Sequence, residues 1–317
     1  MYLPLMPTLS SPRPRAPHPA PRRTLLGVCL LVGGLLQPAG VSAQQPFQIE
    51  THATPTGPDD GVLLQRPATL RARTVHVQLR GDYTNDSLVV ALRGSTVTEI
   101  SVLQHRLVGS VSVAYGVVDR LSLYITLPLV LHQVGASVLG LPEPAARGFG
   151  DLTLGLHAQL FGGSEGAQLG VGLALVEPTG SVQAFASDDR IGGVVQLRFA
   201  YVGHRWSLGA TTGVSLRPDR EWLTHQTGAD LTLVLGGFVH PAEGLRLGLE
   251  LATATGLTDG AFFDRNRTPL EVDLSGRLTM DHGLFVQASA GLGFVNGVGN
   301  PRVRATLALG FTSAQIR

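Results

Sequence analysis

The stretch LEVDLSGRLTM, residues 270–280, alternates aliphatic and polar side chains along its whole length. In an extended strand the aliphatic residues share one face, while Glu271, Asp273 and Arg277 share the other. Strands of soluble sheets average about 5–6 residues, whereas a tilted strand that crosses a bilayer needs about 9–11. Length and alternation together predict a strand that meets lipid on one face and water on the other.

The same period-two pattern continues through the chain beyond residue 73 and predicts twelve strands. Hydrocarbon offers no partner to an unpaired backbone group, so strands that span a membrane must close into a barrel. We therefore expect an all-β fold, a closed antiparallel transmembrane β-barrel. A soluble antiparallel sandwich also alternates, but its strands are shorter. The strands are expected at residues 74–84, 101–117, 121–133, 150–161, 167–177, 191–203, 206–217, 228–240, 245–256, 268–280, 284–295 and 302–312.

Short and long connections alternate between these segments. The joints VVDR, GGSEG, GHR, PAEG and DHG are short, and most of the others are longer. Outer-membrane barrels have short periplasmic turns and longer outer loops, so this order places both ends of the barrel in the periplasm. Two places fit less well. NGVGNP (296–301) is short for an outer loop, and residues 85–100 either extend the first hairpin above the membrane or contain a misplaced strand.

The beginning of the chain has the parts of a secretory signal peptide. Arg22 and Arg23 precede an apolar run at residues 24–36, and small residues lead to an expected cleavage after Ala43. The run is shorter than the roughly 20 residues of a transmembrane helix. The expected division is a signal peptide at 1–43, an irregular periplasmic lead segment at 44–73, the outer-membrane β-barrel at 74–312 and a tail at 313–317.

Composition excludes several classes of partner and site. All 24 basic residues are arginine, and the 20 that follow Ala43 stand against 23 carboxylates, a net charge of −3. That balance gives no basic face for nucleic acid. The single cysteine, Cys29, lies in the predicted signal peptide, so no disulfide is expected in the exported protein. No spacing of ligands suggests a zinc site, and no cofactor or metal is expected. The acidic pairs 59–60 and 188–189 are interpreted as solvated turn carboxylates rather than calcium ligands.

Charged residues on the strand face opposite the aliphatic one are predicted to line the lumen. Two roles stay open for them. Opposed charges select small solutes when the lumen is open, or they pair with one another and fill it. The predicted lumen-lining residues are Arg80, Asp82, Arg198, Arg217, Asp230, Arg246, Glu250, Glu271, Asp273, Arg277, Arg302 and Arg304.

Three passages carry a family resemblance. AYGVVDRLSLYITLPLVLHQVG (114–135), GFGDLTLGLHAQL (148–160) and EPTGSVQAFASDD (177–189) resemble motifs of predicted bacterial outer-membrane barrels. These include the phenol-degradation-pathway (MetA-like) channel family and the barrels that precede an OmpA-type peptidoglycan-binding domain. No such domain follows the last strand here, so tethering to the cell wall is not expected. Gly310 and Phe311 resemble the assembly signal of such barrels.

The resemblance implies an outer-membrane location, with outer-membrane lipid, lipopolysaccharide and the barrel-assembly machinery as partners. The first functional hypothesis is a porin-like channel for passive diffusion of small solutes, and the second is a closed structural or interaction barrel. A third, a lipid hydrolase, needs a Ser/His pair on the lipid-facing rim. His76, His132 and His157 are expected to face inward instead, and no Gly-x-Ser-x-Gly elbow is present. We therefore do not expect an enzyme.

Overall fold

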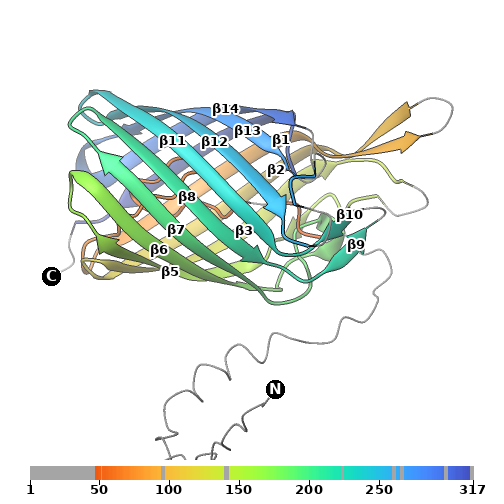
Figure 1. Cartoon of the computed structure of the whole chain (residues 1–317), viewed down its shortest axis with the longest axis horizontal. Coiled ribbons are helices and arrows are strands. Elements are labelled where there is room, and N and C mark those ends of the chain that lie inside the picture. Colours follow the sequence, from red (N-terminus) through yellow and green to blue (C-terminus); the bar gives the residue numbers. More distant parts are fainter. Residues whose placement is uncertain are drawn as a thin grey trace, which may run out of the picture. The chain divides into compact units, whose positions relative to one another are not determined.

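Twelve long strands form a closed barrel in the computed structural model, which describes residues 47–50, 52–93, 97–138, 143–222, 225–258, 262–264, 268–295 and 299–314. Sequence neighbours pair antiparallel, and β1 pairs with β15, which closes the sheet (Figure 1). The barrel strands are β1 (Val75–Arg93), β2 (Val97–Val118), β3 (Leu121–Val134), β5 (Leu152–Phe161), β6 (Gly166–Glu177), β7 (Gly192–Val202), β8 (Trp206–Leu216), β11 (Asp230–Ala242), β12 (Leu245–Gly256), β13 (Leu270–Thr279), β14 (Leu284–Val295) and β15 (Val303–Thr312).

Smaller elements accompany the barrel. They are β4 (Gly148–Phe149) beside β3, a hairpin of β9 (Arg220–Trp222) and β10 (His225–Thr227), and the 3₁₀ turns η1 (Val182–Ala184) and η2 (Asp281–Gly283). No helix in the described part of the chain has the length and apolarity needed to span a bilayer.

The predicted closed antiparallel barrel of twelve strands is confirmed. Of the region 85–100, residues 94–96 lie outside the described residues, and the others extend β1 and β2 into a long first hairpin that projects past the barrel (Figure 1). Beyond Asn85, which pairs with Val303, β1 loses its β15 neighbour and pairs with β2 alone. Residues 296–298 of the connection NGVGNP lie outside the described residues. Just after them, the Gly299 N–H donates to the Ser87 carbonyl at 3.1 Å, so this connection reaches the projecting hairpin.

The short connections follow β2, β5, β7, β11 and β13, at the end of the barrel opposite the projecting hairpin. We assign this end to the periplasm, because outer-membrane barrels carry their short turns there. Gly283 in the turn before β14 has φ 84°, and a β-carbon there would collide with the Thr312 carbonyl oxygen. Position 283 therefore requires glycine.

The barrel wall buries its charged face and exposes its aliphatic face, which is the reverse of a soluble sheet. On β12, Leu247 and Leu249 are exposed, whereas Arg246 before them and Glu250 after them are buried. A soluble sandwich would bury the leucines and expose the charges. Burial of the charged face and exposure of the aliphatic face exclude the sandwich.

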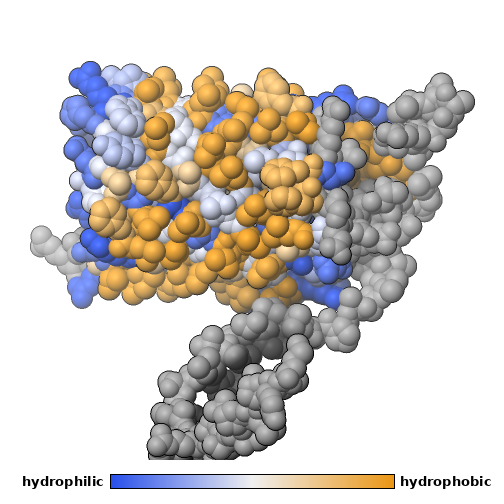
Figure 2. Space-filling model, in the orientation of Figure 1, coloured by the Kyte–Doolittle hydropathy of each residue, from blue (hydrophilic) through white to orange (hydrophobic). Residues whose placement is uncertain are grey.

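The exposed aliphatic face forms a belt that suits lipid. Figure 2 shows an apolar band across the middle of the barrel, with hydrophilic bands towards its two ends. Tyr201 and Trp206 stack at the periplasmic end of β7 and β8, with ring centroids 5.5 Å apart, where an aromatic girdle lies in such barrels. The chain is an outer-membrane β-barrel protein.

The interior contains residues 47–50 and 52–70, here named the luminal segment. Phe47 and Ile49 pack against Leu88 and Leu103 at the base of the projecting hairpin. At the other end the Thr69 hydroxyl donates to the Asp119 carbonyl, in the turn between β2 and β3, at 3.0 Å. The segment thus runs through the barrel from its outer end to its periplasmic end, as the red to orange trace in Figure 1.

This position corrects the expectation of a periplasmic lead segment. The described residues from Phe47 to Thr74 contain neither helix nor strand, so the segment is irregular, but it lies in the lumen. Its apolar residues Val62, Leu63 and Leu64 are buried against Val234 and Phe238 of β11. Removal of this apolar surface from water favours the lumen over the periplasm for the segment.

Candidate channel lumen

Most of the predicted lumen-lining residues lie on the inner face. Their side chains are buried or half-buried, from β1 round the barrel to β15. The residues found there are Arg80, Asp82, Arg198, Arg217, Asp230, Arg246, Glu250, Glu271, Asp273, Arg277 and Arg304. Arg302 is the exception.

Arg302 lies at the outer rim, and its prediction as a lumen residue was wrong. Its side chain is 48% exposed and pairs with Glu99 at 3.1 Å and with Asp86 at 3.7 Å. Both acids belong to the first hairpin, whose extension beyond the barrel the sequence left open. The carboxylates of that hairpin therefore hold Arg302 outside the lumen.

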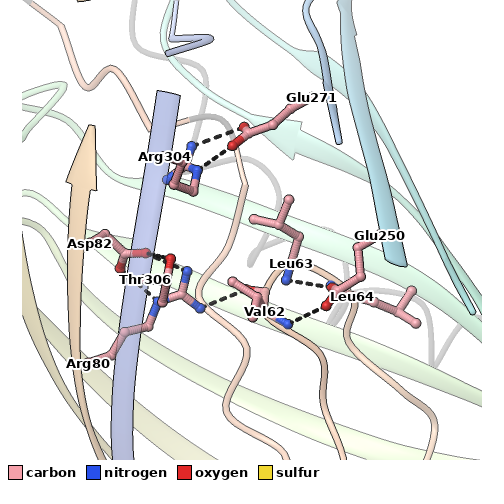
Figure 3. A network of polar contacts seen from close by, with 9 residues as sticks. All are labelled: Val62, Leu63, Leu64, Arg80, Asp82, Glu250, Glu271, Arg304 and Thr306. Atoms are coloured by element: carbon pink, nitrogen blue, oxygen red, sulfur yellow. Dashed lines mark hydrogen bonds and ion pairs between the residues drawn. The ribbon is translucent and has the colours of Figure 1, made fainter. Parts of the chain in front are cut away.

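Glu250 of β12 binds the backbone of the luminal segment. Its carboxylate accepts hydrogen bonds from the N–H groups of Val62 (2.8 Å), Leu63 (2.8 Å) and Leu64 (2.7 Å), as Figure 3 shows. The Ser275 hydroxyl donates a further bond at 3.1 Å. Successive N–H groups of this kind form an anion-binding nest, and hydrogen bonds to an ionised acceptor are the stronger class.

Two arginines hold carbonyl groups of the same segment. Arg80 donates to the Val62 carbonyl at 2.7 Å, and it also forms a bidentate pair with Asp82, with both distances 2.7 Å (Figure 3). Arg246 donates to the carbonyls of Asp59, at 2.7 Å, and Asp60. The inner face thus presents donors and acceptors that match the backbone of residues 59–64.

A socket of two glycines accommodates the Leu64 side chain. Gly209 of β8 and Gly236 of β11 pair directly across the two strands. A β-carbon at either position would lie 2.6 Å or 2.9 Å from Leu64 Cδ2, respectively. The missing side chains at these two positions leave room for a leucine of the luminal segment.

Two carboxylates interpreted from sequence as solvated are buried instead. Asp60 accepts hydrogen bonds from the N–H groups of Gly57 (2.6 Å) and Arg66 (2.7 Å), which closes a loop of the luminal segment. Asp188 accepts bonds from the Gln48 N–H at 2.9 Å and from Arg217 Nε at 2.8 Å. Their neighbours in sequence, residues 59 and 189, are exposed as expected.

A second polar cluster lies on β13 and β15. Arg304 donates to both oxygens of Glu271, at 2.5 Å and 3.2 Å. Asp273 is fully buried, and neither of its oxygens has a hydrogen-bond partner.

A cavity of about 170 Å³ remains between the luminal segment and the wall. Val62, Leu63 and Gln65 of the segment line one side, and Thr126 and Thr211 are among the wall residues on the other. Ion pairs border it: Arg106 with Glu50 at 2.7 Å, and Arg217 with Asp188 at 2.8 Å. With the segment in place, the space between segment and wall is this cavity, lined by both polar and apolar side chains.

In the described part of the chain, no serine hydroxyl hydrogen-bonds a histidine ring; the side-chain hydrogen bonds of the rings there go to Thr312, Tyr83 and Asn85. His76 faces inward and stacks on Phe285 at 5.4 Å, and His157 contacts Tyr124 at 4.5 Å. No group of three or more His, Cys, Asp or Glu residues among the described positions is arranged to hold a metal ion.

The inward placement of His132 was wrong. Leu107 pairs with His132, but Val108 pairs with Val130, so Leu131 is an extra residue that bulges from β3 and shifts the phase of the strand. His132 is exposed, and Gln133 takes the inner position, where it accepts a bond from Arg106 at 2.7 Å.

The two residues of the expected assembly signal lie on β15. Phe311 is on the outer face, and Gly310 faces the Phe285 ring on the inner side. Ala43, the expected cleavage position, lies outside the described residues.

The functional feature that sequence reasoning missed is the luminal segment. One signal was available: VLL at residues 62–64 is an apolar run inside a polar, proline-rich stretch. Such a run in an exported segment needs a surface to cover it.

The chain is similar to a known protein family and to solved outer-membrane barrels. A family model described as putative MetA-pathway of phenol degradation matches residues 72–310. The crystal structure of the COG4313 outer membrane channel from Pseudomonas putida F1 is similar, with 18% identity over 77% of this chain and 97% of that chain and a TM-score of 0.61. The NanC porin is 8% identical over 76% of this chain and 100% of that chain, with a TM-score of 0.50. At these identities the likeness establishes the shared fold. No curated protein matches the sequence.

Proposed function

The chain belongs to the family described as putative MetA-pathway of phenol degradation, and we propose that it is a porin-like outer-membrane channel. Small solutes diffuse passively through its polar lumen, past the luminal segment. The two similar structures are described as a channel and a porin, which supports this proposal. We propose no enzymatic activity.

The observation that carries the proposal is the cavity inside the barrel, which is lined by both polar and apolar side chains. Its lining combines hydroxyl groups and ion pairs with apolar side chains, and the luminal segment forms only part of its boundary. Opposed charges in a narrow lumen select solutes by size and charge. The alternative of a closed structural or interaction barrel is not favoured, because inner residues such as Glu250 and Arg246 bind the segment and a space remains between the segment and the wall.

Reconstitution in planar bilayers tests the proposal. The purified barrel, checked by its heat-modifiable gel mobility, is expected to give discrete conductance steps, and liposomes that contain it are expected to swell in small sugars. A preparation boiled before reconstitution is the control. Electrical silence of the folded protein across pH and salt, with no swelling, would contradict the channel.

The proposed partners follow from the location. We propose that outer-membrane lipid and lipopolysaccharide contact the aliphatic belt, and that the barrel-assembly machinery recognises the last strand with Phe311. The resemblance to barrels that precede an OmpA-type domain stays a prediction from the short motifs.

A further inference from the structure

The luminal segment is fixed at residues 62–64, where the wall provides a receptor for both its backbone and a side chain. We propose that Glu250 sets the size limit of the channel by clamping the luminal segment at these residues, so that loss of the clamp widens the pathway. This inference rests on the proposed channel function, and it assigns the control of pore size to one carboxylate.

Glu250 differs in its partners from two other inner carboxylates, Asp82 and Glu271. Asp82 pairs with Arg80 and Glu271 with Arg304, at 2.7 Å and 2.5 Å. Among the ion pairs of the described residues, none includes Glu250, although its side chain is fully buried. Its acceptor capacity is used by three backbone N–H groups of the segment and one hydroxyl of the wall. A buried carboxylate that loses such donors is strongly disfavoured, so the wall and the segment stabilise each other.

The fit around the clamp is close on both sides. Gly61 lies so near Glu250 that a β-carbon there would collide with its carboxylate oxygens. Leu64 occupies the socket of Gly209 and Gly236. The segment is therefore held at one position along the lumen. Its N–H groups bind Glu250, Gly61 fits against that carboxylate, and Leu64 fills the apolar socket.

Release of the segment would enlarge the space that a solute meets. Val62, Leu63 and Gln65 form one side of the cavity of about 170 Å³. These residues adjoin the three N–H groups held by Glu250, so the position of the clamp determines where this side of the cavity lies. Displacement of residues 62–65 joins the cavity to the volume that the segment now fills.

The test combines a labelling readout with a pore readout on the full chain in liposomes. Thr56 of the segment is 1% exposed, so the Thr56→Cys variant, in a Cys29→Ser background, reports release of the segment by reaction with a maleimide. Glu250→Gln is added to this background. The NH2 group of glutamine is a hydrogen-bond donor, so it cannot bind the backbone N–H groups, which are donors too. The control is Glu99→Gln, an equal charge change at an exposed outer residue. Heat-modifiable mobility confirms that each barrel is folded.

We expect Glu250→Gln to raise the labelling rate at least about tenfold, the ratio for losing one hydrogen bond to a charged acceptor. Conductance is expected to rise with it, and larger sugars are expected to enter the liposomes. Glu99→Gln is expected to match the parent in both readouts. Unchanged labelling would show that Glu250 is no clamp, and faster labelling without a wider pore would show that the segment does not set the size limit. Either result overturns the proposal.

The test also covers a variant that fails to fold and a barrel that does not conduct. If Glu250→Gln fails to fold, Gly209→Val displaces Leu64 from its socket without a change of charge, and the same two readouts apply. If no variant conducts, the channel function fails, and pore-size control fails with it. The labelling ratio then still decides whether Glu250 clamps the segment, so the two failures are distinguishable.

Discussion

The Leu64 side chain fills the space in front of Gly209, where a β-carbon would come within 2.6 Å of Leu64 Cδ2. An alanine at position 209 therefore has to push the leucine away or distort β8. We expect Gly209→Ala to loosen the luminal segment while the barrel stays folded, measured as faster maleimide labelling of the Thr56→Cys variant.

Gly81 provides the matched control, because no atom lies within 4 Å of the β-carbon that alanine would add there. Gly81→Ala is expected to label at the parent rate. Equal labelling of the two alanine variants would mean that Leu64 has no specific socket.

Replacement of Arg80 and replacement of Arg302 are expected to lower the folding stability of the barrel by different amounts. Arg80 is buried and binds Asp82, so Arg80→Gln leaves a carboxylate in the lumen without its charge partner, which costs about 3–5 kcal/mol. Arg302 is 48% exposed, and an exposed pair is worth about 0–1 kcal/mol. Urea unfolding in lipid vesicles, followed by gel mobility, is expected to show a larger loss of stability for Arg80→Gln than for Arg302→Gln. A larger loss for Arg302→Gln would contradict the placement of both residues.

The lipid-facing side is tested by Leu249→Arg. Leu249 is 56% exposed in the interior of β12, where an arginine at the bilayer midplane costs about 2–4 kcal/mol. The variant is expected to insert poorly and to yield little heat-modifiable barrel in outer-membrane fractions. Leu257→Arg, beyond the end of β12, is the control and is expected to insert normally. Normal insertion of Leu249→Arg would contradict the assignment of lipid to this face.

The barrel was predictable because its strands repeat one local rule. The alternation in LRLGLELA gave β12 its observed bounds, Leu245–Gly256, and it placed Arg246 and Glu250 inside. That rule fails wherever the phase is interrupted. The extra Leu131 in β3 moved His132 to the outer face, and the extension of the first hairpin carried the acids that hold Arg302 at the rim.

The luminal segment could not be derived in the same way. Its residues follow no period, and the partners of Glu250 are backbone N–H groups, which every non-proline residue carries and which leave no mark in the sequence. The inner charges were expected either to select solutes or to pair with each other. Several of them instead bind a part of the chain about 20 to 190 residues away, such as Val62 with Arg80 and Glu250.

Single-channel conductance of the intact chain, compared with that of a chain lacking residues 47–67, tests the central claim most directly. The account predicts small steps for the intact protein and severalfold larger steps for the shortened barrel, because the lumen is then free of the segment. Equal steps from two barrels that both fold, or silence from both, would contradict a channel narrowed by its own luminal segment.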